Sequence, residues 1–357
     1  MSETSISGSV TQSHLAKLVG VSQMTVSRVL RGLPGVNPKV KRSILAAAKK
    51  HGYVADANFA ARMLRLKGKA GHATHVTCVL IQDPGEEEHF NQRILRGVSA
   101  AARQMDQEVV FVPDVVPGQL PRIVMRRQVD GVIRLPCDAD VLRGCAACPV
   151  PWVSILFDMP GADLVTVDNR AAARDLSRHL CGLGHRRIAF IGPDSPLSRD
   201  RQEGLRDALR EVGADLPAEA VAVQRYAMTA ETTRDLLARL EAGSPGVPIE
   251  KRFTVLSAYN DYMAVTVLRF LRERGVRVPE DVSVTGFDGA LSGLVRERGI
   301  TTVALPLEDL GGEAMRLLAW RFANPGALRR KALIETRLVV GETTSAVRAG
   351  VPARPST

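Results

Sequence analysis

Beyond residue 71 the chain alternates short, nearly continuous apolar runs with longer amphipathic stretches, and this alternation restricts the fold more than any other feature. The apolar runs predict buried strands at 76–81, 109–112, 131–135, 152–157, 188–191, 221–223, 254–258 and 282–286. The amphipathic stretches predict helices at 91–105, 171–183, 201–212, 229–240 and 261–274. Such alternation predicts an α/β fold with parallel sheets covered by helices on both faces. This many strands suit two sheets better than one, so we expect two lobes with a small-molecule site in the cleft between them.

The first fifth of the chain has a different, all-helical pattern. Apolar residues spaced three and four apart predict three short helices, whose buried sides are formed by Leu15, Leu18 and Val19, by Val26, Val29 and Leu30, and by Val40, Ile44 and Ala47 or Ala48. Gly20 ends the first helix and Ser22 caps the second. Asn37 caps the third helix ahead of Pro38, and Gly52 ends it. Two short helices joined by a glycine turn and braced by a third predict a helix-turn-helix.

The second helix of such a motif enters the major groove of DNA, where its first residues meet base edges. Gln23, Met24 and Arg28 are the candidates for base contacts, since glutamine suits adenine and arginine suits guanine. With flanking residues, and with two positions further along the chain, the expected DNA-binding set is Thr11, Ser22, Gln23, Met24, Thr25, Ser27, Arg28, Arg31, Asn37, Arg62 and Leu64.

Charge is distributed unevenly along the chain, whose net charge is +10. Residues 1–72 contain twelve Lys/Arg and two acidic residues, whereas the remainder contains thirty-six of each sign. A small basic head on a neutral body is what the phosphate backbone of DNA attracts. Lys39, Arg42 and Lys49 of the third helix either contact phosphates or keep that helix soluble, and both interpretations stay open.

Two segments of the head resemble a known family. The head of LacI/GalR-type repressors is closely resembled by two stretches, SHLAKLVGVSQMTVSRVLRG at 13–32 and VNPKVKRSILAAAKKHGY at 36–53. The resemblance implies a hinge helix in which Leu64 enters the minor groove at the centre of a palindromic operator and Arg62 lies near the backbone. An ordinary linker helix is the alternative. The approach to the hinge, 53–59, lacks the usual proline of the family and is slightly longer.

The resemblance continues through the body, at 165–192, 201–209, 257–289 and 338–344. It implies a core like that of periplasmic sugar-binding proteins, with two lobes joined by three crossovers, in a cytoplasmic homodimer whose lobe angle positions the hinge helices. The expected domains are 1–55 for the head, 56–71 for the hinge and linker, and 72–357 for the effector-binding and dimerisation core. Within the core we expect one lobe at 72–184 with 302–324, and the other at 185–301 with 325–345.

Polar residues after predicted strands are the candidates for the effector site, because ligands of open α/β sheets bind beyond the carboxyl ends of the strands. Asp288 follows such a strand, and the resemblance makes Arg201, at the predicted start of a helix, a ligand-clasping residue. Asn260 is interpreted as a ligand contact and Asp261 as the N-cap of the next helix. The expected effector-binding set is Asp83, Phe90, Asp168, Asn169, Arg201, Asn260 and Asp288.

Several of these candidates have a plainer alternative. Arg201 could form a surface ion pair with a neighbouring acid, and Asp288 could cap a helix or turn. Phe90 either stacks on a sugar or belongs to the core. Of the adjacent Asp168 and Asn169, one is expected to face the cleft.

The sequence argues against an enzyme, a metalloprotein and a membrane protein. No glycine-rich phosphate loop and no persuasive catalytic arrangement occurs, so neither a catalytic residue nor a cofactor is expected. Cys145 and Cys148 lack two further ligands for zinc. The odd number of cysteines, five, suits a reducing cytoplasm. No stretch is long and apolar enough for a membrane span, and the N-terminus has no export leader.

The predicted function is that of a sequence-specific transcription regulator, a repressor whose affinity for DNA changes when a small metabolite enters the cleft. The resemblance favours a sugar or sugar derivative, and a purine-like corepressor is the alternative. A second class is a DNA-binding head fused to an enzyme-like or transport-like domain, which turnover of a ligand by the isolated body would reveal. A third is an architectural DNA binder with a vestigial pocket, which a ligand screen without hits would favour.

Overall fold

The computed structural model describes residues 12–30, 36–50, 75–80, 88–112, 120–135, 148, 150–225, 229–291 and 299–347. Five candidate residues, Thr11, Arg31, Arg62, Leu64 and Asp83, lie outside these ranges, and so does the side chain of Ser27. The other candidates can be located.

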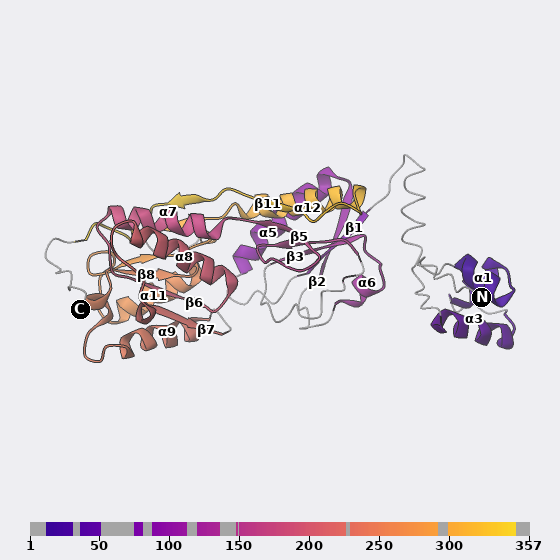
Figure 1. Ribbon diagram of the computed structural model, residues 1–357, viewed down its shortest axis with the longest axis horizontal. Helices are drawn as coiled ribbons and strands as arrows, with labels where there is room; N and C mark the ends of the chain where they lie inside the picture. Colours follow the sequence, from indigo (N-terminus) through magenta and orange to yellow (C-terminus); the bar gives the residue numbers. More distant parts are fainter. Residues whose placement is uncertain are drawn as a thin grey trace, which may run out of the picture.

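Three helices form the head, as the sequence predicts: α1 (Gln12–Val19), α2 (Gln23–Leu30) and α3 (Pro38–Lys50) (Figure 1). Their shared core contains Leu15, Ala16, Val26, Val29, Ile44 and Ala48. Leu18, which the sequence predicts to be buried, is instead 49% exposed. Ala16 takes its place on the buried side of α1, because a small side chain lets this short helix approach both of its neighbours.

The turn between α1 and α2 follows the predicted signals. Gly20 has a φ of +69°, and the N–H of Val21 donates to the carbonyl oxygen of Ala16 at 3.0 Å, which is the Schellman way of ending a helix. The Oγ of Ser22 accepts from the N–H of Thr25 at 3.1 Å and so caps α2. The predicted turn of the helix-turn-helix is confirmed.

The first lobe is built on a six-stranded parallel sheet with the order β11-β5-β4-β3-β1-β2. Its strands are β1 (His75–Leu80), β2 (Gln107–Val112), β3 (Gly131–Arg134), β4 (Trp152–Ile155), β5 (Asp163–Thr166) and β11 (Lys331–Leu333). On one face, α5 (Glu88–Gln104) and α12 (Leu307–Ala323) pack against each other. The short α6 (Arg122–Met125) packs against the other face (Figure 1).

The second lobe is built on a four-stranded parallel sheet with the order β7-β6-β8-β9. Its strands are β6 (Ile188–Pro193), β7 (Val221–Gln224), β8 (Val255–Ala258) and β9 (Ser283–Thr285). Two isolated bridges place β10 (Thr302–Ala304) beside β9, and β12 (Arg337–Val339) pairs antiparallel with β10.

Helices cover both faces of this second sheet. The pair α7 (Asn169–Gly182) and α8 (Pro196–Arg210) lies on one side, and α9 (Ala230–Ala242) lies on the other (Figure 1). Next to α9 packs α11 (Asp261–Glu273), and two short elements, η4 (Ala218–Ala220) and α10 (Ile249–Arg252), precede β7 and β8. The predicted α/β architecture is therefore present in both lobes.

The chain passes between the lobes after β5, after β10 and between β11 and β12. The positions of these crossovers differ from the expected lobe boundaries. Because α7 packs on α8, the first crossover lies near 167–168 rather than at 184. β10 belongs to the second lobe and β11 to the first, the reverse of the expected assignment, because these three-residue strands complete the edges of sheets formed by distant parts of the chain.

Two helix pairs approach so closely that only glycine fits at the contact. A Cβ on Gly311 of α12 would lie 2.1 Å from a backbone oxygen of α5, and one on Gly97 of α5 would lie 1.9 Å from the carbonyl oxygen of Glu308. In the second lobe, a Cβ on Gly204 of α8 would lie 2.2 Å from the carbonyl oxygen of Arg170 in α7. These glycines set the distance between the paired helices.

We expect Gly204→Ala to lower the free energy of unfolding by about 2 kcal/mol, because overpacking against a backbone oxygen outweighs the gain in helix propensity of about 1 kcal/mol. Gly182 of α7 gives a matched control, since a Cβ there meets nothing within 4 Å. Gly182→Ala should leave stability unchanged or raise it. Urea unfolding of both variants measures the difference, and equal stabilities would contradict the close contact of α7 with α8.

Candidate functional site

Arg201 lies at the centre of the candidate effector site. It is in the second turn of α8, which begins at Pro196, and not at the start of a helix as predicted. Its Nε donates to Oδ1 of Asn169 at 3.0 Å, Nη1 to the carbonyl oxygen of Tyr259 at 2.5 Å, and Nη2 to Oδ1 of Asp288 at 3.0 Å. Since the side chain is only 3% exposed, the alternative of a surface ion pair is wrong.

Two aromatic rings enclose the same guanidinium. Its carbon lies 3.7 Å from the ring centroid of Phe287 and 4.3 Å from that of Tyr259, in cation–π range. A buried arginine needs acceptors and a counter-charge, and here it has both. Sequence reasoning missed the two rings, although each directly precedes a singled-out polar residue, Asn260 or Asp288.

Asp288 is held in a backbone conformation that side chains rarely adopt. Its φ is +92°, and Gly289 follows with a φ of +63°. Such a conformation costs about 1–3 kcal/mol and persists only where surrounding contacts enforce it. Here the N–H of Asp288 donates to Val303 at 2.8 Å and its carbonyl oxygen accepts from Leu305 at 3.1 Å. Burial raises the pKa of the carboxyl group, and the adjacent Arg201 acts in the opposite direction.

The N-cap of α11 is Asn260 and not Asp261, the residue that the sequence predicted. Oδ1 of Asn260 accepts from the N–H of Met263 at 2.9 Å, so Asn260 is the N-cap of α11. Asp261 is buried beside it, and its Oδ1 accepts from the hydroxyl of Thr302 at 2.7 Å. Burial raises the pKa of Asp261 to about 7, the hydrogen bond from Thr302 lowers it, and the nearby charge of Asp288 raises it further.

The remaining effector candidates separate into two groups. Asn169 is buried and bonded to Arg201, whereas Asp168 is exposed and caps α7 by accepting from the N–H of Ala171 at 2.9 Å. Phe90 is buried in the hydrophobic core, so its core alternative is the correct one. The structure thus brings together Asn169, Arg201 and Asp288 and keeps Phe90 apart from them.

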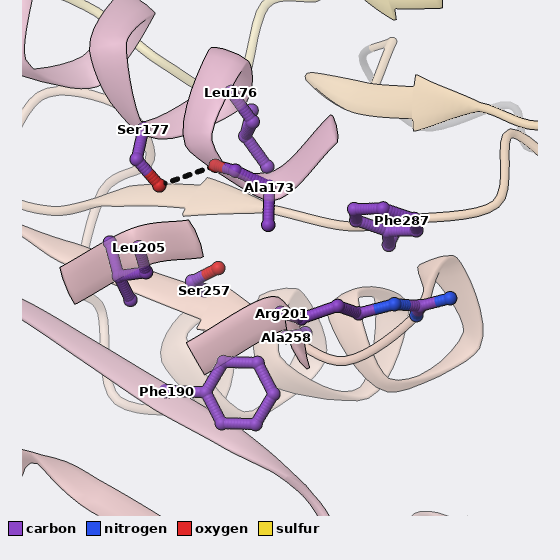
Figure 2. A pocket seen from close by; sticks show the side chains of 9 residues that line it. All are labelled: Ala173, Leu176, Ser177, Phe190, Arg201, Leu205, Ser257, Ala258 and Phe287. Carbon is purple, nitrogen blue, oxygen red and sulfur yellow. Dashed lines mark hydrogen bonds between the residues drawn. The ribbon is translucent and has the colours of Figure 1, made fainter. Parts of the chain in front are cut away.

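A small pocket lies behind Arg201, between α7, α8 and the strands of the second sheet (Figure 2). It is lined by Ala173, Leu176, Ser177, Phe190, Arg201, Leu205, Ser257, Ala258 and Phe287. Its space is water-sized rather than sugar-sized, so it is a gap in the lobe interior and not itself an effector site. Within the described ranges, no cluster of His, Cys, Asp and Glu could hold a metal ion.

In the head, Gln23, Met24 and Arg28 all lie exposed on α2, and Met24 is 73% exposed. Ser22 and Asn37 each accept a backbone hydrogen bond with a side-chain oxygen and so cap the helix that follows. Thr25 is half-buried, and its Oγ1 lies 2.9 Å from Oγ of Ser22. The exposed side chains are those that the sequence predicts to contact bases. In the part of the chain that is described, no helix could cross a membrane.

Comparison with known proteins assigns the chain to a family. The family of bacterial regulatory proteins named lacI matches residues 13–56, and a periplasmic binding protein-like domain matches 177–344. The HTH-type transcriptional regulator Rv3575c of Mycobacterium tuberculosis is 30% identical over 371 residues, covering 96% of this chain and 98% of that protein. The chain belongs to the lacI family.

Other members of the lacI family agree with this assignment. The HTH-type transcriptional regulator CelR of Thermobifida fusca is 30% identical over 92% of this chain and 96% of that protein. A solved structure of a transcriptional regulator CelR–cellobiose complex has a TM-score of 0.63 at 26% identity, covering 94% of this chain and 99% of that one. The resemblance and the fold class that the sequence predicts are confirmed, and this lacI-family chain is a DNA-binding transcriptional regulator.

Asp261 makes the stability of the chain depend on pH. Between about pH 4 and pH 7 the folded chain keeps a proton on Asp261 that the unfolded chain releases, so the free energy of unfolding falls as pH rises through this range. Asp261→Asn removes the titration and keeps an oxygen that accepts from Thr302. The stability of the wild type relative to this variant should therefore decline between these pH values.

Urea unfolding across this pH range measures the difference, with exposed Asp175→Asn as the control for loss of a carboxylate. A constant difference between wild type and Asp261→Asn would contradict the raised pKa.

Proposed function

We propose that this regulator is a repressor that binds a two-fold symmetric operator as a homodimer and changes its affinity for DNA when a carbohydrate binds beside Arg201 and Asp288. The observation that carries the proposal is the joining of an exposed, basic helix-turn-helix head to a body that holds a buried arginine among polar and aromatic groups. The head suits DNA, and the group around Arg201 suits a small polar ligand.

The DNA part of the proposal rests on the exposed side of α2. Gln23 and Arg28 are residue types that read adenine and guanine through paired hydrogen bonds. The surplus of ten positive charges in residues 1–72 supplies phosphate attraction that does not depend on base sequence. A dimer presenting two such heads explains a preference for a palindrome.

The effector part rests on the group around Arg201. Arg201, Asn169 and Asp288 have planar side chains that suit hydrogen bonds to sugar hydroxyl groups, and the rings of Tyr259 and Phe287 hold the guanidinium in position. The cellobiose bound in the similar CelR complex supports a carbohydrate over a purine. We propose binding without turnover, because these groups suit hydrogen bonding and the relatives of this chain are transcriptional regulators.

We expect Arg28→Ala to weaken binding to the preferred operator by about 1–3 kcal/mol and to relax the preference at one base position. Lys39→Ala is the matched control: if Lys39 contacts a phosphate, its loss weakens binding to all sequences alike, and if it only keeps α3 soluble, binding is unchanged. Selection of bound duplexes from a random pool, followed by titration at two salt concentrations, measures both effects. An unchanged base preference in Arg28→Ala would show that Arg28 does not contact a base.

We expect Asp288→Asn to lose the rise in melting temperature that sugars produce, while operator binding persists. The amide keeps the shape of the carboxylate but removes the charge that faces Arg201. Asp168→Asn is the control, because Asp168 is exposed and asparagine caps helices equally well. Thermal unfolding with cellobiose and a panel of monosaccharides tests this, and equal shifts in Asp288→Asn and wild type would refute the site.

A further inference from the structure

One arginine of the first lobe reaches the loop that carries Asp288. In α5, Nε and Nη2 of Arg93 donate to the two carboxylate oxygens of Glu308, at 2.8 Å and 2.7 Å. Nη1 of the same side chain donates to the carbonyl oxygen of Gly289 at 3.1 Å. Glu308 belongs to the first lobe, whereas Gly289 follows β9 in the second, so a single guanidinium joins the two lobes.

At the first-lobe end of this bridge, the backbone of Glu308 is tightly packed. Glu308 lies in the first turn of α12, directly after the crossover from β10. Gly97, one helical turn after Arg93 on α5, lies so close to the backbone of Glu308 that a Cβ would overlap it. The backbone that carries the carboxylate is therefore fixed, and the hydrogen bonds from Arg93 lower the pKa of Glu308 and keep it charged.

The second-lobe end of the bridge adjoins the effector site. Gly289 is bonded covalently to Asp288, and both residues have positive φ. The side chain of Asp288 pairs with Arg201, and its carbonyl oxygen accepts from Leu305, which lies in the crossover that leads to α12. Any displacement of Asp288 is therefore passed to the oxygen that Arg93 holds.

We propose that Arg93 is a positioning residue that couples the effector site to the arrangement of the two lobes, by holding the Asp288–Gly289 segment against the first lobe. The proposal rests on the proposed function, in which an effector binds at Arg201 and Asp288. A ligand that draws Asp288 away from Arg201 moves Gly289 and releases it from Arg93, while the Arg93–Glu308 pair stays closed. The lobes then change their relative arrangement, which shifts the population of DNA-competent molecules.

The strength of the bridge suits this role. The side chains of Arg93 and Glu308 are 26% and 41% exposed, so water weakens their attraction. The connection from Arg93 to Gly289 is a single hydrogen bond from a charged donor to a neutral carbonyl oxygen. The free energy of a ligand contact can exceed the free energy of one such bond. Within the second lobe, by contrast, the Arg201–Asp288 pair is almost completely buried.

The first test needs neither DNA nor sugar. In the full-length protein, Arg93→Met should speed hydrogen exchange at the amides of Asp288 and Leu305 by about fivefold, the change that loss of one supporting hydrogen bond produces. Arg93→Lys should restore part of the protection, because a lysine reaches one partner at a time. Arg103→Met, on the exposed side of the same helix, is the matched control and should leave both amides unchanged.

Unchanged exchange in Arg93→Met, or an equal increase in Arg103→Met, would overturn the proposal. The second test is the ratio of operator affinities with and without cellobiose, which should fall towards one in Arg93→Met while cellobiose binding is kept. If this ratio in Arg93→Met equals that of the wild type, the proposal is also overturned. If wild type itself shows no response to cellobiose or to the sugar panel, the carbohydrate part of the proposed function fails, and the exchange result alone decides whether Arg93 holds the segment.

Discussion

The ion pair between Arg201 and Asp288 is nearly removed from water, and the groups around it are arranged to keep it so. Removing one partner of such a pair costs about 3–5 kcal/mol, because the other charge stays buried without compensation. The same guanidinium also bonds Asn169 at the start of α7 and the carbonyl oxygen of Tyr259 after β8. A single side chain thus links two helices and the ends of two strands, so a ligand that contacts it acts on all of them.

The ion pair within the second lobe is more deeply buried than the contact between the lobes. The pair at Arg201 is enclosed by Phe287 and Tyr259, which exclude water and strengthen the electrostatic attraction. The contact that Arg93 makes between the lobes is one hydrogen bond to the carbonyl oxygen of Gly289, made by a side chain that is 26% exposed, and it is correspondingly weaker. The arrangement combines a buried ion pair inside one lobe with a weaker hydrogen bond between the lobes, which suits a regulator in which ligand binding changes the relation of the lobes without unfolding either of them.

Long periodic segments were predictable because hydrophobic periodicity needs a window of many residues to be recognised. β10 and β11 were not predicted, since three residues carry no periodicity and their partners lie far away in sequence. α12 was not among the predicted helices, and its Gly311 allows close packing on α5. A strand end pointed to Asp288, which the structure pairs with Arg201. Asn260 and Asp261 both cap helices well, and distant Thr302 decides between them.

The discontinuous first lobe has a consequence for biosynthesis. Its sheet receives β11, and its α5 receives α12, only after the second lobe has been translated as far as β10. A nascent chain that has reached residue 300 therefore exposes an open edge at β5 and the apolar side of α5, both of which favour aggregation. The head, whose contacts are local, is expected to fold on the ribosome, while the body closes only after the C-terminal segment is released.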